Sequence, residues 1–232
     1  IVLVVIGILI ALQINNWNEQ KKERVTEKKI LKELLVDLEI SKADLENDIR
    51  INKKWLKPSE AIKKHLYYKK AYHDSIEEML ITASDMSQFT PRTSGYQNLK
   101  SVGLNIIAND SLRKEITNVF ERSFEYSRLE GREFDKIDNS NIELNSFFIK
   151  YFTIDIDREL NFTLPNKAFS HKTNSIKILN YKALLSEKEF LLTLQKTIYD
   201  RFSKIRTYAN TVRKIDQVSS MIETELNRLK NN

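Results

Sequence analysis

The hydrophobic pattern of the chain changes after its first twelve residues. Residues 1–12 (IVLVVIGILIAL) carry no polar side chain, and Gln13 is the first interruption. An uninterrupted apolar run is typical of a membrane span, a signal-peptide core or a buried helix. Beyond the run, apolar residues recur every three or four positions, which predicts helices with one apolar face.

Two features favour a membrane span for the opening segment. Trp17 follows the run among asparagines, and an indole is favoured at the level of the lipid headgroups. No small-residue cleavage site follows, which argues against a signal peptide. A buried core helix is the alternative. Because the chain begins on Ile1 rather than Met, we expect the span, taken as residues 1–17, to be N-terminally incomplete.

The first helix is predicted to continue past the span as a stalk. Apolar residues at alternating spacings of four and three are typical of helices that pack side by side at a shallow angle. We expect Pro58 to end this helix, with Ser59 as the N-cap of the next one. The predicted seam of the stalk consists of Leu31, Leu35, Leu38, Leu45 and Ile49.

Further long helices follow from the same pattern. One is predicted over Ser111–Phe152, and a last one over Ser186–Leu229, opening with the capping-box sequence SEKE. Residues 59–103 are expected to form shorter helices. The predicted fold is therefore all-α, with a transmembrane helix that continues into an elongated antiparallel bundle of about four helices. The extramembrane domain takes residues 18–232, with an irregular crossover at about 153–174.

Composition supports a helical chain without indicating a reaction. Only four Gly and three Pro occur in 232 residues, too few for the turns of a sheet-rich fold. The sequence contains no Cys, which removes disulfides, thiolate metal sites and cysteine nucleophiles. The net charge is +6, but bases alternate with acids along the chain, so we predict no binding to nucleic acid.

Candidate catalytic and metal-binding residues are few. His65 and His73 are eight positions apart, whereas a metal pair on a helix needs a spacing of three or four, so we interpret them as surface residues, like His171. Asp155 and Asp157 lie on one side of an extended stretch of the crossover and could hold a divalent cation loosely. We predict no catalytic residue, no metal and no cofactor. An enzyme that uses this acid pair is the least favoured alternative.

Two strings resemble the hallmarks of one protein family. IVLVVIGILIALQINNWNE at the N-terminus and SGYQNLKSVGLNIIANDSLRKEI at residues 94–116 resemble the two signatures of an uncharacterised family, a domain of unknown function in single-pass bacterial membrane proteins. The likeness extends over essentially the whole chain. No activity, ligand or catalytic residue is established for that family, so the resemblance implies a location and not a chemistry.

The resemblance also implies an orientation. In such proteins a short basic segment precedes the hydrophobic run, which holds the N-terminus inside and places the body in the periplasm, anchored by one span in the bacterial inner membrane. The bases that follow the span, from Lys21 to Lys29, favour the opposite orientation with a cytoplasmic body. We follow the resemblance and expect a periplasmic C-terminal domain.

The second string is interpreted first as a corner between two helices. Gly103 suits a helix C-terminus with positive φ, and Asp110 is the predicted cap of the next helix. The alternative is a polar pocket for a small anion or a peptide end, built from side chains of the same corner. The candidate interaction corner consists of Tyr96, Lys100, Ser101, Gly103 and Arg113, and Trp17 is the candidate anchor at the membrane interface.

The predicted function is that of a membrane-anchored helical interaction or structural module. We expect it to assemble with itself or with a larger envelope protein complex, with the lipid bilayer as a further partner. The stalk seam and Gly7 in the span motivate this hypothesis, because a small residue lets transmembrane backbones approach. The alternative is a sensor-type module that binds a ligand outside the cytoplasm and transmits a shift along the first helix.

Overall fold

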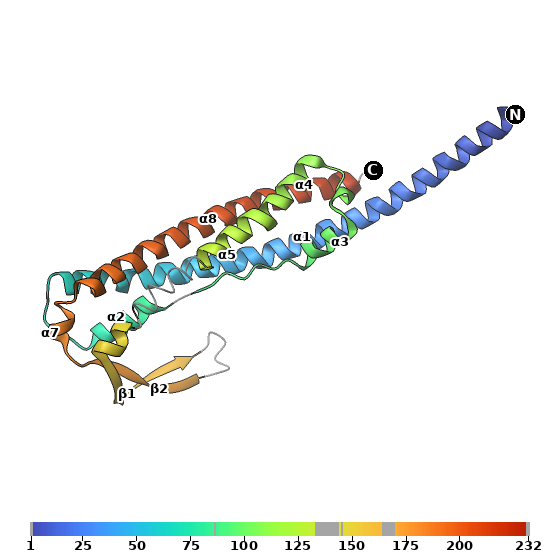
Figure 1. Cartoon of the computed structure of the whole chain (residues 1–232). Coiled ribbons are helices and arrows are strands. Elements are labelled where there is room, and N and C mark those ends of the chain that lie inside the picture. Colours follow the sequence, from blue (N-terminus) through green and yellow to red (C-terminus); the bar gives the residue numbers. More distant parts are fainter. Residues whose placement is uncertain (1, 86, 133–143, 145, 164–169, 231–232) are drawn as a thin grey trace. The chain divides into compact units, whose positions relative to one another are not determined.

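The computed structural model describes all residues except 1, 86, 133–143, 145, 164–169 and 231–232 (Figure 1). Helices account for most of the described residues, and the described sheet has only two strands, so the prediction of a helical fold is confirmed. The chain divides into two compact units. Unit 1 comprises Ile1–Asn47, Phe89–Arg128 and Tyr208–Asn232, and unit 2 comprises Asp48–Gln88 and Leu129–Thr207.

The first helix, α1, extends over Val2–Tyr67. The prediction that Pro58 ends it is wrong. Proline removes one backbone donor, but the helix continues through it, and the Ser59 hydroxyl donates to the Trp55 carbonyl at 2.7 Å. Ile62, one turn beyond the proline, is fully buried in the core of unit 2. We attribute the continuation to this packing, which outweighs the lost hydrogen bond.

Unit 1 is built from the first part of α1, the last part of α8 (Lys188–Lys230) and the chain between residues 89 and 128. The Lys42 ammonium donates to the Asp216 carboxylate at 2.5 Å, which joins α1 and α8 within this unit. The elements between them are α3 (Ser94–Val102), η1 (Leu104–Ile106), α4 (Asp110–Thr117), the π-helical turn η2 (Asn118–Ser123) and α5 (Phe124–Arg132).

The wide turn η2 interrupts the long helix predicted over Ser111–Phe152, of which residues 133–143 and 145 lie outside the described residues. The Ser123 hydroxyl donates to the Asn118 carbonyl, five residues earlier, at 3.3 Å. Phe120 within this turn and Phe124 directly after it both lie in the core of unit 1. Their rings lie 5.0 Å apart, and Phe89 meets the Phe124 ring at 5.6 Å.

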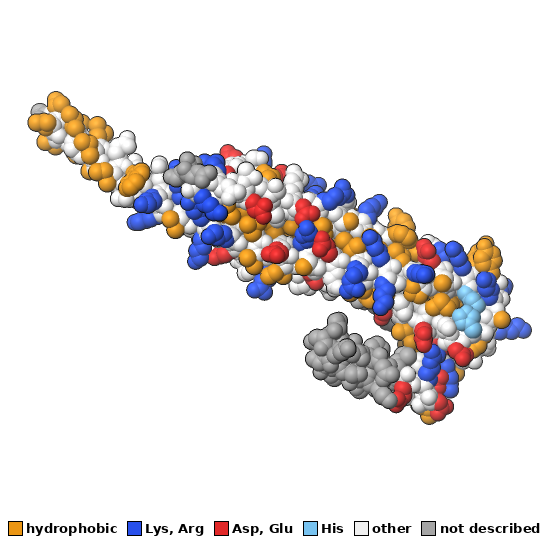
Figure 2. All heavy atoms as spheres, turned by 180° about the vertical axis from the view of Figure 1, so that it is seen from behind, with side chains coloured by type: hydrophobic (Ala, Val, Ile, Leu, Met, Phe, Trp, Pro, Cys, Tyr) orange, Lys and Arg blue, Asp and Glu red, His pale blue; other side chains and the backbone are white. Residues whose placement is uncertain are grey.

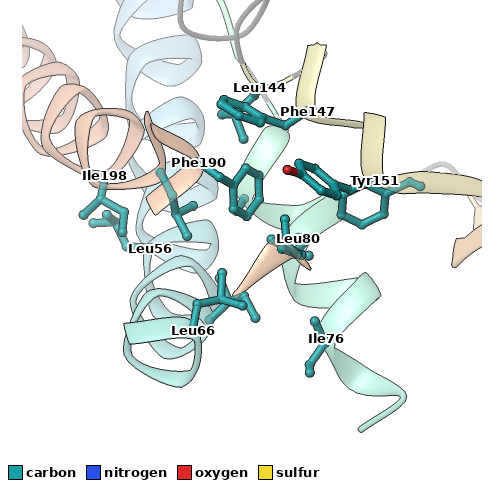
Figure 3. Close-up of a cluster of buried hydrophobic side chains, with 14 residues drawn as sticks. Leu56, Leu66, Ile76, Leu80, Leu144, Phe147, Tyr151, Phe190 and Ile198 are labelled. Carbon is teal, nitrogen blue, oxygen red and sulfur yellow. The ribbon is translucent and has the colours of Figure 1, made fainter. Parts of the chain in front are cut away.

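Unit 2 has its own apolar core. It combines the later part of α1, α2 (Ser75–Ser84), a helical stretch at residues 146–151, α7 (Tyr181–Leu184) and the start of α8. Figure 3 shows side chains from these elements converging on one cluster. The labelled members are Leu56, Leu66, Ile76, Leu80, Leu144, Phe147, Tyr151, Phe190 and Ile198.

The predicted irregular crossover at about 153–174 is wrong, because its described residues belong to an antiparallel hairpin; residues 164–169 lie outside the described residues. Strand β1 (Phe152–Thr163) pairs with β2 (Ser170–Ile178), with Phe152 opposite Ile178. The register shifts between Asp155 and Glu159, and there the Asn174 amide donates to the Ile156 carbonyl at 3.1 Å. Burial of Phe152 and Ser175 holds the hairpin to unit 2.

Candidate functional site

The buried stripe of α1 differs in phase from the predicted seam. Leu31, Leu38 and Leu45 are buried, whereas Leu35 and Ile49 are half-buried. At the remaining turns of the predicted seam, the buried residue is the one before the predicted position: Leu34, Ser41 and Asp48. Two of these three residues are polar. The stripe therefore keeps spacings of four and three but consists of Glu27, Leu31, Leu34, Leu38, Ser41, Leu45, Asp48 and Asn52.

In unit 1 the buried acids of α1 hold the chain around α3. The Asp37 side chain is 2% exposed and accepts hydrogen bonds from the Gly95 N–H at 2.6 Å and the Ser94 hydroxyl at 3.0 Å. It therefore caps the N-terminus of α3 from another helix. Glu27 accepts from the Ala108 N–H at 3.0 Å, and burial raises its pKa.

Two further hydrogen bonds complete this attachment. The Ser41 hydroxyl accepts from the Arg92 N–H at 2.9 Å, and the Asn98 amide donates to Glu33 at 2.7 Å. Because later residues of the segment meet earlier residues of α1, the chain from residue 90 to 108 is antiparallel to α1. Side chains of the helix accept from backbone N–H groups of the segment at Arg92, Gly95 and Ala108.

Gly95 lies where α3 is closest to α1. A Cβ atom at this position would be 2.9 Å from the backbone carbonyl carbon of Glu33. Backbone cannot move aside as the end of a long side chain can, so a side chain here would force α3 away from α1. The second signature thus contains a glycine that the contact between two helices requires, a role that the sequence pattern did not indicate.

The candidate corner residues take part in the fold. Tyr96 is buried and stacks on Phe120, with ring centroids 4.6 Å apart, and burial raises its pKa to about 12. Gly103 has φ +109°, and its N–H donates to the Leu99 carbonyl at 2.9 Å, as predicted for a helix C-terminus. The Lys100 ammonium lies 5.3 Å from the centroid of the Tyr96 ring.

Arg113 and Ser101 are also engaged within the corner. The Arg113 guanidinium donates to the Ile107 carbonyl at 2.9 Å, and the Ser101 hydroxyl donates to the Asn98 carbonyl at 2.8 Å. The cap of α4 is Asn109, one residue before the predicted Asp110, and it accepts from the Leu112 N–H at 3.1 Å. The corner therefore favours the structural interpretation over a polar pocket.

In unit 2, His65 and His73 lie side by side, although their spacing in the sequence did not predict a pair. The rings of His65 and His73 are perpendicular, with centroids 4.8 Å apart, because the chain turns back directly after α1. Burial lowers the pKa of His65, and the neighbouring His73 lowers it further. Within the described residues, no group of three or more His, Cys, Asp or Glu side chains is arranged to hold a metal ion.

The acid pair of the hairpin is used locally. Asp155 accepts from the Asp157 N–H at 3.3 Å and faces the Lys177 ammonium at 3.9 Å across the strands. These contacts engage the Asp155 carboxylate at the irregular position of the hairpin.

A hollow of about 330 Å³ opens on the surface of unit 2 between α1 and α8. Its exposed apolar side chains are large: Tyr67 is 66% exposed and Leu192 is 69% exposed. The Lys63 ammonium donates to Gln195 at 2.8 Å across the hollow. Among the described residues, no acid lines it. Figure 2 shows Lys/Arg and apolar side chains next to the pale-blue histidines of this unit. The lining consists of Lys63, Lys64, Tyr67, Tyr68, Leu191, Leu192 and Gln195.

A second hollow, of about 370 Å³, lies in unit 1 next to the N-terminal apolar segment. Three bases of α1 line it, and the Lys21 ammonium is 5.4 Å from the centroid of the Trp17 ring. Leu229, near the end of α8, forms the facing wall. We call this group the basic collar; its lining is Trp17, Gln20, Lys21, Arg24, Val25, Lys28 and Leu229.

The described part of the chain does not cover the apolar start of α1. Its large side chains from Val2 to Ile14 are each about half exposed or more (Figure 2). An 18-residue window near the N-terminus of α1 has a mean hydropathy of 1.4, and none of it is buried. Within the residues that the structure describes, α1 is the one helix long and apolar enough to cross a membrane. An apolar surface of this extent is what lipid would cover in a span.

These features define a class of helical proteins that have a possible membrane helix at the N-terminus and a mainly helical body. The chain belongs to a family of unknown function, DUF6090, whose sequence model matches residues 1–163 of the 232. The prediction of an uncharacterised family is thereby confirmed. Comparison with curated proteins and with solved structures finds no significant match.

Proposed function

We propose that this protein is a membrane-anchored helical module that binds a protein partner through the hollow of unit 2. In this proposal the apolar start of α1 spans the bacterial inner membrane, with Trp17 at the interface, and both units lie in the periplasm. The hollow of unit 2 carries the proposal. It combines exposed aromatic and aliphatic side chains with lysines at one place.

The chemistry of the hollow indicates the kind of partner. Tyrosines supply a large contact area at a small cost in conformational entropy, and exposed aromatic side chains are enriched in interface cores. Lys63 and Lys64 add positive charge without an acid among the lining residues. A segment that offers an apolar side chain and nearby carboxylates, from an envelope protein or from a second copy of this chain, would match both features.

Photo-crosslinking in native membranes tests this proposal. A photoreactive phenylalanine replaces Tyr67 in one variant and Tyr199 in the other, because both tyrosines are 66% exposed in unit 2. Only the Tyr67 position lines the hollow. We expect a crosslinked protein, identified by mass spectrometry, from position 67 and none from position 199.

Charge reversal adds a second readout. Lys63→Glu together with Lys64→Glu should suppress the crosslink from position 67, because it replaces the positive charge of the hollow with negative charge. Equal yields from positions 67 and 199, or a yield that does not respond to the charge reversal, would contradict the proposed contact.

A further inference from the structure

The bases that follow the apolar segment are concentrated along one line of α1. Residues separated by four, three and four positions share a face of a helix, and this is the spacing of the collar residues. Glu19, Glu23 and Glu27, the acids of the same stretch, lie outside the lining of the collar. The line therefore presents positive charge without acids: Trp17, Lys21, Arg24 and Lys28.

The depth of these residues suits the headgroup layer of a bilayer. A hydrocarbon core of about 30 Å within a bilayer of about 40–45 Å leaves roughly 5–8 Å of headgroup on each side. At a rise of about 1.5 Å per residue, Lys21 is about 6 Å beyond Trp17 along α1, and Arg24 is about 10 Å beyond it. With the indole at the interface, Lys21 comes level with the lipid phosphates, and the long side chains of Arg24 and Lys28 extend back toward them from further along α1.

The collar is also hollowed to receive a group. Its volume of about 370 Å³ lies between the basic line of α1 and Leu229 of α8. Leu229 is buried and supplies an apolar wall next to the three bases. A phosphodiester with the first carbons of its acyl chains has this combination of negative charge and apolar surface.

We propose that the basic collar is a binding site for the headgroup of an anionic phospholipid, held by Lys21, Arg24 and Lys28 beside Trp17. This inference rests on the membrane anchor of the proposed function and goes beyond it, because it assigns a lipid class and the residues that select it. Electrostatic attraction of about fivefold per base near an anionic surface makes a several-fold preference over zwitterionic lipid the expected result.

Quenching of Trp17 fluorescence by brominated lipids tests the site in the full-length chain. The protein is reconstituted in phosphatidylcholine vesicles that contain an equal mole fraction of either brominated phosphatidylglycerol or brominated phosphatidylcholine. Trp55→Phe leaves Trp17 as the only indole, since the chain has two Trp residues. We expect the anionic quencher to be several-fold more effective than the zwitterionic one.

Two matched double variants separate a site from general attraction. Lys21→Gln with Lys28→Gln removes two bases of the collar, whereas Lys22→Gln with Lys29→Gln removes two bases one position further, about 100° around the helix. Both lose the same charge at almost the same depth. The preference should disappear in the first variant and persist in the second. Equal loss in both variants would overturn the site in favour of non-specific attraction.

The remaining outcomes are also decisive. If inorganic phosphate at constant ionic strength abolishes the preference, the ligand is a free anion and the lipid assignment falls. Quenching by brominated phosphatidylcholine with no preference for the anionic lipid would overturn this inference and leave the anchor intact. No quenching by either lipid would overturn the anchor of the proposed function itself, so the two failures are distinguishable.

Discussion

Units 1 and 2 both attach a connecting segment to a long helix, but they use charges of opposite sign. In unit 1 the carboxylates of Asp37 and Glu27 on α1 accept hydrogen bonds from backbone N–H groups at and beyond α3. In unit 2 the cations of α8 donate to backbone carbonyls after α2. Lys204 reaches the Ser87 carbonyl at 2.6 Å, and Arg201 reaches the Asp85 carbonyl at 2.7 Å.

Arg201 of α8 contacts the rest of unit 2 through hydrogen bonds and through an aromatic ring. Arg201 is 4% exposed, and its guanidinium also donates to the Ala83 carbonyl at 3.0 Å and lies 5.1 Å from the centroid of the Trp55 ring. Burial lowers its pKa to about 10, so the group is still a cation at neutral pH. Burial also raises the pKa of Asp85.

The difference in sign has an energetic consequence. A backbone N–H offers one donor, and a buried N–H without an acceptor is rarely tolerated, whereas a carbonyl has two lone pairs and is more often left partly satisfied. We therefore expect unit 1 to depend more strongly on its buried acids than unit 2 does on its buried bases.

The largest effect is expected for Asp37→Ala. The change leaves the Gly95 N–H and the Ser94 hydroxyl without their buried acceptor, at a cost of about 3 kcal/mol or more in the free energy of unfolding. Denaturant unfolding of the full-length chain in detergent micelles measures the loss, and hydrogen exchange at the amides of α3 localises it to unit 1. Asp37→Asn keeps one acceptor oxygen and should lose less. Glu39→Ala, which removes an exposed acid of the same helix, should change little.

Gly95→Ala should have the next largest effect, and its sign is diagnostic. Alanine favours a helix over glycine by about 1 kcal/mol, so a gain is expected wherever space allows. Here the new Cβ meets the Glu33 backbone at 2.9 Å, and we expect a net loss of about 1–3 kcal/mol. Gln97→Ala, on the exposed face of α3, serves as the control. A more stable Gly95→Ala variant would show that α3 does not pack against α1 this closely.

Arg201→Met tests unit 2 and should cost less, about 1–2 kcal/mol. The carbonyls of Ala83 and Asp85 lose a donor, but the change also removes a buried charge whose desolvation opposes folding. Unfolding of the full-length chain measures the loss, with Arg206→Met at an exposed position of α8 as the control. A loss as large as that of Asp37→Ala would contradict the asymmetry between the units.

The elements predicted successfully depend on local spacing. The exposed apolar run, the long last helix and the positive φ of Gly103 each follow from a pattern within a few turns of chain. The alternation of spacings along α1 was also predicted, and Leu31, Leu38 and Leu45 are buried at the shared positions. Local preferences of the backbone and side chains carry this information.

The features that escaped prediction depend on partners distant in sequence. Ser41 and Asn52 occupy buried positions that an apolar periodicity does not indicate, because their hydrogen-bond partners, Arg92 and Ser87, are distant in sequence. Pro58 is tolerated inside a helix because of the core around it. The proximity of His65 and His73 comes from a turn whose direction their spacing does not encode.

A change of pH should separate the two units further. The folded-state pKa of His65 is lowered from its ordinary value of 6.5 by burial and by His73, so the folded protein binds this proton less readily than the unfolded chain. Its contribution to stability is present above the unfolded pKa and is lost as pH falls through that value and then the folded one. Between about pH 7.5 and 5 the wild type should therefore lose more stability than His65→Gln, as measured by denaturant unfolding at each pH.

The smallest effect on stability is expected at Glu27, where the change with pH has the opposite sign to that at His65. Burial raises the pKa of this carboxyl above its ordinary 4.5, so the folded protein binds the proton more readily than the unfolded chain does. This contribution is full below the unfolded pKa and is lost as pH rises through the folded value, so acidification stabilises unit 1 at this group. Glu27→Gln still offers an oxygen to the Ala108 N–H and should remove the gain while leaving neutral-pH stability almost unchanged. If acidification loosened unit 1 and unit 2 equally in hydrogen exchange, the opposite titration of Glu27 and His65 would not be what distinguishes the units.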